Sequence, residues 1–205
     1  MSAKEFKVVL AGQFGSGRTA FASRFTSAKS DKKKIAAIKT EVFPVSLYTS
    51  AGSATLKLYD TLVHAKGGLP EHNFFQADAC LLFFDTTKEA SYEALTEWYD
   101  AIVKANGRKG SEPLPIIIVG TKVDDVKNRA VKPKDIDFAK KKGLPYMEIS
   151  SKANFNVKEL ILETVKALLG TGTQLTDEIA LEKATTEVDE ATLSGFKKEY
   201  EEASN

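Results

Sequence analysis

The chain has 205 residues, of which 42% are hydrophobic and 28% are charged, and its formal net charge is +1. This composition is ordinary for a soluble globular protein, and the balanced charge excludes nucleic-acid or membrane binding driven by bulk electrostatics. One cysteine, Cys80, stands in the apolar run ACLLFF, which is typical of a reduced core thiol in an intracellular protein. No apolar run reaches transmembrane length, and neither Ser2 nor the final residues EASN offer a lipidation signal, so we expect no membrane anchor.

Strand-like and helical patterns alternate along the chain. The runs at 79–85 and 115–121 are continuously apolar, which is typical of central strands covered on both faces. This alternation predicts an α/β fold in which a mostly parallel, six-stranded sheet carries helices on both faces. The predicted strands are 5–11, 42–48, 54–60, 79–85, 115–121 and 145–149, and the predicted helices are about 18–27, 88–105, 133–142 and 157–169.

The sequence becomes polar after residue 169. The stretch GTGTQLTDEIALEKATTEV has the composition of a loose linker, which we place at 171–188. Asp189 is a good helix N-cap, and Leu193, Phe196 and Tyr200 then fall roughly on one helical face. We therefore expect a main domain at 1–170, the linker, and a weakly docked C-terminal helix with its tail at 189–205.

A glycine-rich stretch, GQFGSGRT, lies between the first predicted strand and the first predicted helix. It follows the pattern G-x-x-x-x-G-K-[ST], except that Arg18 stands in place of the lysine. In such a turn the backbone N–H groups point at phosphate oxygens, and the Thr19 hydroxyl suits Mg²⁺. We interpret the stretch as a phosphate-binding loop rather than a merely flexible turn. Its candidate nucleotide-binding residues are Gly12, Gln13, Phe14, Gly15, Ser16, Gly17, Arg18, Thr19 and Ala20.

Three further motifs directly follow predicted strands. They therefore lie at the carboxyl ends of the strands, where parallel sheets bind their ligands. Asp60 is a candidate metal ligand beside Thr19, holding Mg²⁺ through water. In the motif Thr121-Lys122-Val123-Asp124, the Asp124 carboxylate could accept hydrogen bonds from the N1–H and 2-amino group of guanine, a donor pair that adenine lacks. The Lys122 stem could lie along the base or ribose. A third turn, whose N–H groups could contact the guanine O6, consists of Ser150, Ser151 and Lys152.

With these motifs in this order, the chain resembles the small GTPases of the Ras superfamily, and within them the Ran branch of nuclear-transport GTPases. The likeness extends over essentially the whole chain, from KKKIAAIKTEVFP, similar to the first switch, to VDEATLSGFKKEYEEA, similar to the extra C-terminal helix. It implies the P-loop G-domain fold and a GTP/GDP site with Mg²⁺.

The resemblance also implies partners and a location. We expect karyopherin-type transport receptors or Ran-binding proteins as partners, no direct nucleic-acid contact, a monomer, and residence in the nucleus and cytoplasm. A basic stretch in this branch contacts receptors, and a solvated helix face would explain the same residues equally well. The matching residues here are Lys140, Lys141 and Lys142.

The departures from the family pattern gather where the γ-phosphate would lie. Phe14 stands where glycine is usual and would crowd the γ-phosphate. Arg18 keeps the positive charge of the loop lysine, but its planar fork has a different shape from a compact ammonium. Ala37 stands where the first switch carries threonine and offers no oxygen to Mg²⁺. Thr121, in place of asparagine, is a milder change because a hydroxyl can still tether the loop.

The second switch departs most. The family pattern D-T-A-G-Q reads Asp60-Thr61-Leu62-Val63-His64 here, so the glycine that senses the γ-phosphate and the water-orienting glutamine are replaced. His64, near the glutamine position, is at best a poor catalytic substitute. Since hydrolysis depends on positioning around the γ-phosphate, these changes favour weak or lost GTP hydrolysis. Three interpretations stay open: a guanine-nucleotide-binding protein that hydrolyses poorly, a pseudo-GTPase scaffold that binds no nucleotide, and a working Ran-type switch.

Overall fold

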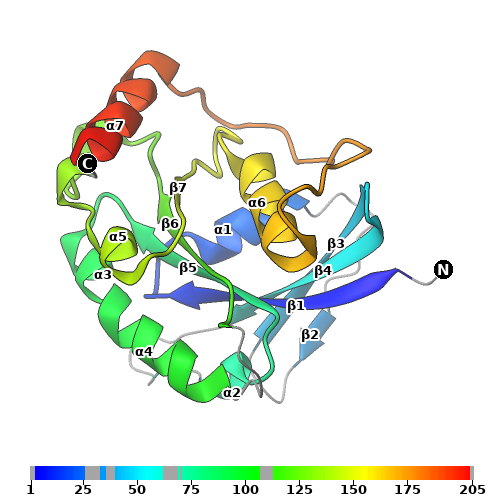
Figure 1. Cartoon of the computed structure of the whole chain (residues 1–205). Coiled ribbons are helices and arrows are strands. Elements are labelled where there is room, and N and C mark those ends of the chain that lie inside the picture. Colours follow the sequence, from blue (N-terminus) through cyan, green and yellow to red (C-terminus); the bar gives the residue numbers. More distant parts are fainter. Residues whose placement is uncertain are drawn as a thin grey trace.

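The computed structural model describes residues 3–25, 33–35, 40–61, 69, 71–106 and 113–203. Within them lies one seven-stranded sheet of order β2-β3-β4-β1-β5-β6-β7 (Figure 1). Strands β4, β1, β5, β6 and β7 run parallel, while β3 is antiparallel to β4 and β2 to β3. The strands are β1 (Lys4–Gly12), β2 (Lys33–Ile35), β3 (Thr40–Thr49), β4 (Gly52–Thr61), β5 (Ala79–Asp85), β6 (Ile116–Thr121) and β7 (Tyr146–Glu148).

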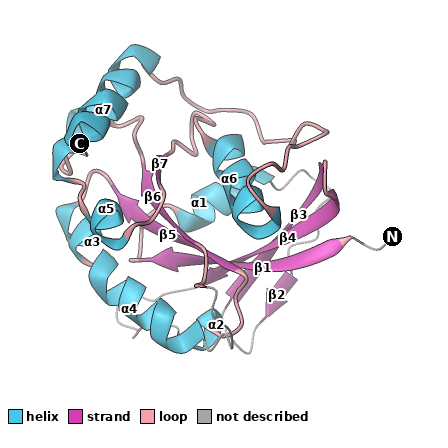
Figure 2. Ribbon diagram, in the orientation of Figure 1, coloured by secondary structure: helices cyan, strands magenta, loops and turns pink. Residues whose placement is uncertain are grey.

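The predicted fold class is confirmed, and each of the six predicted strands is present. The seventh strand, β2, was not predicted because three residues carry too little pattern. Helices cover both faces of the sheet (Figure 2). The helices are α1 (Arg18–Ala22), α2 (Glu71–Phe74), α3 (Glu89–Glu93), α4 (Leu95–Asn106), α5 (Phe138–Lys142), α6 (Val157–Leu169) and α7 (Glu190–Ala203), with 3₁₀ turns η1 (Ser23–Phe25), η3 (Val126–Asn128) and η4 (Pro133–Asp135).

The helix predicted at 157–169 is observed at those bounds, and the other three predicted in the main domain differ from prediction. The helix predicted at about 18–27 consists of α1, which ends at Ala22, followed by the 3₁₀ turn η1, and positions 26 and 27 lie outside the described residues. The helix predicted at 88–105 is divided at Ala94 into α3 and α4. The helix predicted at 133–142 consists of the turn η4 followed by the short helix α5.

Two hydrophobic cores flank the sheet. Side chains of α1 and α6 pack on one face, and those of α4 and α5 on the other. Every residue of β5 is buried, as its continuous apolar run predicts. Cys80 lies within this strand, where burial raises the pKa of its thiol, so it is an unreactive core residue.

Residues 171–188, named here the C-terminal strap, lie against the domain instead of forming the loose linker that composition suggested. Leu175 forms a bridge with Thr49, and Ile179 is only 7% exposed. The N–H groups of Glu182 and Thr185 donate to backbone carbonyls beyond α1 and β7, respectively. The strap therefore crosses one face of the sheet before the chain enters α7.

Helix α7 lies beside β7 and η4 (Figure 1). The Asp189 carboxylate accepts hydrogen bonds from two N–H groups of its first turn, as the predicted N-cap requires. The Tyr200 ring centroid lies 4.7 Å from that of Tyr146, and the Arg129 guanidinium lies 4.5 Å from the Phe196 ring centroid. In the described part of the chain, no helix has the length and apolarity that a membrane span requires.

Candidate functional site

The glycine-rich loop joins β1 to α1 and depends on glycine at two positions. Gly12 has φ of 131°, and a Cβ there would lie 2.2 Å from the Phe83 carbonyl oxygen. Gly17 has φ of 95°, and a Cβ there would lie 3.1 Å from the Thr121 hydroxyl oxygen. A side chain at Gly12 would displace the Phe83 backbone, and one at Gly17 would push against the Thr121 side chain. Glycine at these two positions therefore lets the loop lie close to β5 and β6.

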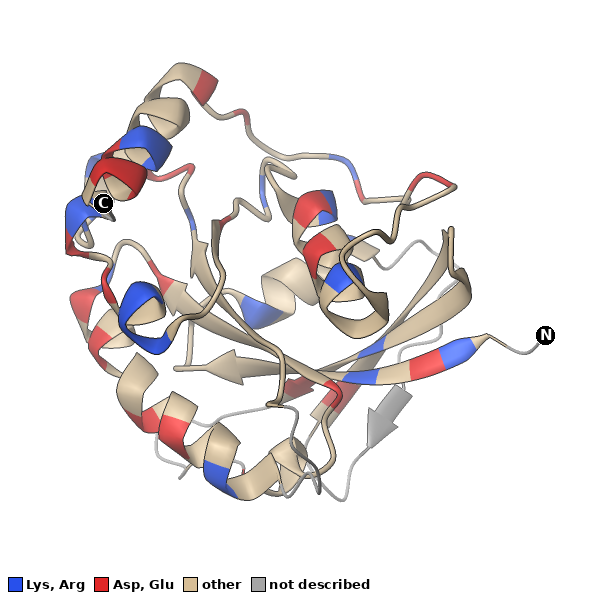
Figure 3. Ribbon diagram, viewed as in Figure 1, with Lys and Arg blue, Asp and Glu red and all other residues tan. Residues whose placement is uncertain are grey.

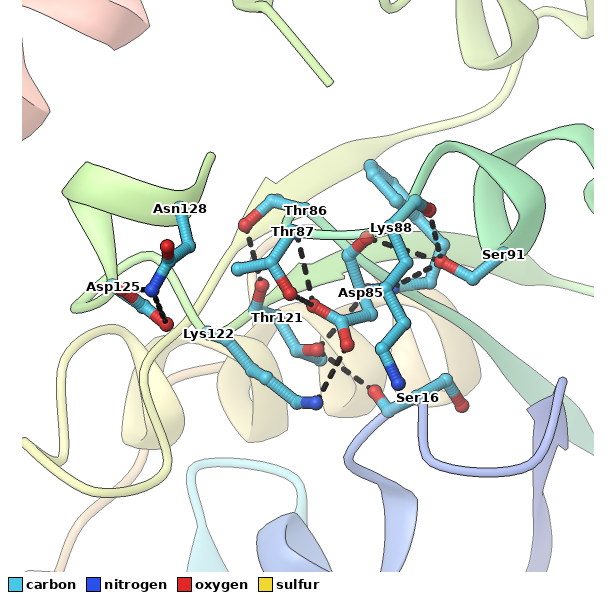
Figure 4. A network of polar contacts seen from close by, with 11 residues as sticks. Ser16, Asp85, Thr86, Thr87, Lys88, Ser91, Thr121, Lys122, Asp125 and Asn128 are labelled. Carbon is cyan, nitrogen blue, oxygen red and sulfur yellow. Dashed lines mark hydrogen bonds and ion pairs between the residues drawn. The ribbon is translucent and has the colours of Figure 1, made fainter. Parts of the chain in front are cut away.

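Thr121 ties the end of β6 to this loop. Its buried hydroxyl lies 2.8 Å from the Ser16 carbonyl oxygen and 3.1 Å from that of Phe84, and donates its hydrogen toward these acceptors. A hydroxyl in place of asparagine predicts such a tether, and the Thr121 bond to the Ser16 carbonyl is one (Figure 4). The loop is therefore fixed relative to the strand whose end carries Lys122 and Asp124.

Lys122 is fixed by Asp85 at the end of β5, a residue that was not among those predicted from the sequence. Its Nζ lies 2.6 Å from Asp85 Oδ2, while the N–H and hydroxyl of Thr87 donate to Oδ1 (Figure 4). Burial alone would raise the pKa of Asp85, but the hydrogen bonds from Lys122 and Thr87 lower it below its ordinary value. An acid at the end of a predicted strand, the pattern that marked Asp60, could have revealed Asp85 as well.

The residues proposed to contact guanine lie together. The Ser150 hydroxyl donates a 2.6 Å hydrogen bond to Asp124 Oδ1 and accepts one from the N–H of Ala153. This pairing orients the Asp124 carboxylate, which is half-buried, and leaves Oδ2 outside that bond. Ser151 is half-buried and Lys152 is exposed, so both can face a ligand at the ends of β6 and β7.

Arg18 is the first residue of α1, and its guanidinium lies at the end of β4. There it is next to Asp60, a predicted metal ligand, and Thr61 of the predicted second switch. Its terminal nitrogen donates a 2.6 Å hydrogen bond to the Thr61 hydroxyl, which donates in turn to the Leu10 carbonyl. Its Nε lies 4.0 Å from Asp60 Oδ1, and its guanidinium carbon 5.9 Å from the Trp98 ring centroid. Within the described part of the chain, this guanidinium contacts Thr61, Asp60 and Trp98 rather than other residues of the glycine-rich loop.

The two candidate metal ligands also meet at this point. The Thr19 hydroxyl donates to Asp60 Oδ2, while Asp60 Oδ1 is buried and has no hydrogen-bond partner within the described residues. Burial raises the pKa of Asp60, and the Thr19 bond and the Arg18 charge partly oppose that rise. The oxygen types suit Mg²⁺, but a guanidinium beside the carboxylate already supplies positive charge there.

The remaining predicted residues have the following places. Gln13, Gly15 and Ala20 are exposed, and the Phe14 side chain is 65% exposed at the loop surface. Ala37, Val63 and His64 lie outside the described residues.

The basic stretch forms the exposed end of α5, and its lysines are coloured blue in Figure 3. Lys141 pairs with Asp137 at 2.5 Å, and Lys142 lies 4.6 Å from the centroid of the Tyr99 ring. Lys140 lies 3.5 Å from the Ala203 carbonyl of α7. These contacts are at the surface and leave the stretch open to solvent.

The fold, the loop and the guanine-side residues all point to one family. A family model described as the Ras family matches residues 7–170. The chain belongs to the Ras family. The matched segment begins in β1, includes every motif described above and ends after α6, so this small GTPase carries the family's GTP-binding domain there. Proteins of the family generally bind GTP or GDP together with Mg²⁺.

Proposed function

We propose that this Ras-family protein is a Ran-like guanine-nucleotide-binding protein in which GTP hydrolysis is weak or lost. The observation that carries the proposal is a division within the site. The groups on the guanine side keep an ordered arrangement, whereas Arg18, in the place of the loop lysine, contacts the end of β4. The arrangement of the guanine-side residues thus supports binding of the base, whereas the position of the Arg18 guanidinium does not support catalysis of hydrolysis.

Support for guanine comes from Asp124 and Lys122. A carboxylate held by Ser150 accepts hydrogen bonds and donates none, which matches the two adjacent donors on guanine. Lys122, held by Asp85, keeps an extended stem beside the same strand ends. Both side chains are positioned by residues of the protein, so little ordering is needed when a nucleotide binds.

Support for weak hydrolysis comes from the loop. Phosphoryl transfer needs cations and donors placed against the γ-phosphate, and the family lysine provides one of them. The Arg18 guanidinium instead contacts Thr61 and Asp60. Sequence adds the replaced glutamine and glycine of the second switch. These features together favour nucleotide binding over turnover.

Partners and location follow from the Ran resemblance. We propose that karyopherin-type receptors or Ran-binding proteins contact the basic stretch of α5, since its lysines are exposed and lie on one short helix. On this proposal the protein is a monomer in the nucleus and cytoplasm, without direct nucleic-acid contact or a membrane anchor.

The first experiment is to denature the purified protein and separate the released nucleotide by ion exchange beside GDP and GTP standards. Bound guanine nucleotide with turnover far below that of an ordinary small GTPase, with or without an activating protein, is expected. Ordinary turnover would contradict weak hydrolysis and support a working switch. An empty site that also fails to bind a fluorescent guanine nucleotide would support the scaffold alternative.

Asp124→Asn tests the guanine assignment directly. An asparagine amide presents one acceptor and one donor, which matches the N1–H and 2-oxo group of xanthine rather than guanine. We expect GDP affinity to fall by roughly 10²-fold or more, because hydrogen-bond groups are left unpaired, with XDP affinity rising. Asp125→Asn, one residue further along, is the matched control and should leave both affinities unchanged. Equal GDP affinity in Asp124→Asn and the parent protein would remove Asp124 from the site.

A further inference from the structure

Arg18 and Asp60 form a buried pair of opposite charges. Their side chains are 6% and 1% exposed, and their closest atoms, Nε and Oδ1, are 4.0 Å apart. Burying an isolated charge is strongly unfavourable, so each of these groups depends on a counter-charge nearby. Within the described residues, the carboxylate nearest this guanidinium is that of Asp60.

The guanidinium contacts Thr61 and Trp98 in addition to Asp60. It donates to Thr61, whose own hydroxyl donates 3.1 Å to the Leu10 carbonyl of β1. The ring of Trp98 from α4 has its centroid 5.9 Å from the guanidinium carbon. A planar group bound in this way is preorganised, and it does not need a nucleotide to fix it.

This placement changes the charge that a nucleotide would meet. A diphosphate in the loop is repelled by an uncompensated Asp60 carboxylate, and a divalent cation between them normally removes that repulsion. Here Arg18 already neutralises Asp60, while a second cation at the same carboxylate would be repelled by the guanidinium.

We propose that Arg18 is the resident counter-ion of Asp60, and that the site therefore binds guanine nucleoside diphosphate without a divalent cation. This proposal rests on the proposed nucleotide binding, and it adds that the binding does not depend on Mg²⁺. Thr19 has a matching role, since its hydroxyl donates to Asp60 Oδ2 and so helps to satisfy the carboxylate.

The test is a titration of nucleotide-free protein with fluorescent GDP, once with millimolar Mg²⁺ and once with excess EDTA. For the unmodified protein we expect the two dissociation constants to agree within about threefold. Such a difference corresponds to less than half the binding free energy of a tenfold change in affinity. Affinity that falls by more than about tenfold in EDTA would overturn this inference while leaving the proposed function intact. No binding in either buffer would overturn both.

Arg18→Lys assigns the effect to the residue. A compact ammonium lacks the planar guanidinium that donates to Thr61 while lying 4.0 Å from Asp60, so we expect the ratio of the two dissociation constants to rise by about tenfold or more. Arg129→Lys is the matched control, because Arg129 is an equally buried arginine that pairs with Glu148 of β7 instead of Asp60. An unchanged ratio in Arg18→Lys, or the same rise in Arg129→Lys, would contradict the role of Arg18. The unmodified protein decides the main question even where a variant folds poorly.

Discussion

At the scale of single residues, the site depends on polar side chains at strand ends that bind one another. Thr121, Asp85 and Ser150 each hold a neighbour in place by a short hydrogen bond. Because these partners come from different strands, each bond also fixes the distance between two parts of the site. Loss of one partner should therefore reduce stability and disturb ligand geometry together.

Thr121→Val removes the tether without changing side-chain shape. The Ser16 and Phe84 carbonyls lose their hydroxyl donor, and we expect a loss of about 1–3 kcal/mol in unfolding free energy. Guanine nucleotide affinity should fall as well. Thr164→Val is the control, since its buried hydroxyl donates to Leu160 within α6, remote from the loop. Urea unfolding and nucleotide titration check both variants, and equal effects of the two on affinity would contradict the tether's role.

Asp85→Asn gives a prediction with a pH dependence. Because the pKa of Asp85 is lowered in the folded state, its ionised form adds stability above the ordinary aspartate value of 3.8, and this is lost as pH falls through the folded value. We therefore expect the variant to be less stable than the parent at pH 7, with the gap closing near and below pH 4. Unfolding free energies measured across this range check it. A gap that stays constant with pH would show that the ion pair with Lys122 is not responsible.

At the scale of elements, the C-terminal strap is the main departure from the pattern of the sequence. Its composition resembles a linker, yet it is fixed through Arg24 of η1 and Asn154 of the loop after β7. The Arg24 guanidinium donates to the carbonyls of Glu182 and Lys183, and Asn154 donates 2.8 Å to that of Glu182. The strap is therefore attached beside Lys152, whose carbonyl accepts from the Thr185 N–H.

Arg24→Ala should release this part of the strap. It removes the donors to Glu182 and Lys183, each worth about 1 kcal/mol, so local amide exchange across 178–186 should become roughly tenfold faster or more. Exchange in β1 and β5 should stay slow, because the hydrogen bonds of the Arg24 side chain are to Asn154, Glu182 and Lys183. Hydrogen–deuterium exchange with peptide resolution measures this, with Lys158→Ala on α6 as a surface control. Unchanged exchange in the strap would mean that its apolar contacts alone hold it.

At the scale of the whole molecule, the parallel sheet brings distant segments to one edge. The loop after β1 and the ends of β4, β5 and β6 all open on the same side of the sheet (Figure 1). The two hydrophobic cores fix the strands, so the positions of the strand ends follow from packing far from the site. The strap starts beside the turn between β3 and β4 and reaches Lys152, after β7, before the chain enters α7 beside β7.

Much of this architecture could be predicted from the sequence. A fully buried strand such as β5 must be apolar throughout, and a phosphate-binding turn must carry glycine where a Cβ would collide, as at Gly12. Those are local requirements, so they leave local patterns. The family and the guanine-side motifs could be recognised for the same reason, since each motif follows a strand directly.

The directions and partners of side chains were decided only by the tertiary structure. Arg18 reads as a loop residue, but it contacts Thr61, which is 43 positions away; Lys122 contacts Asp85, 37 positions away; and Arg24 contacts Asn154, 130 positions away. No local pattern marks such pairs, because burial and charge compensation are settled between strands and loops that meet only after folding. The sequence by itself determined the elements and the place of the site, while tertiary packing decided which charges in that site compensate one another.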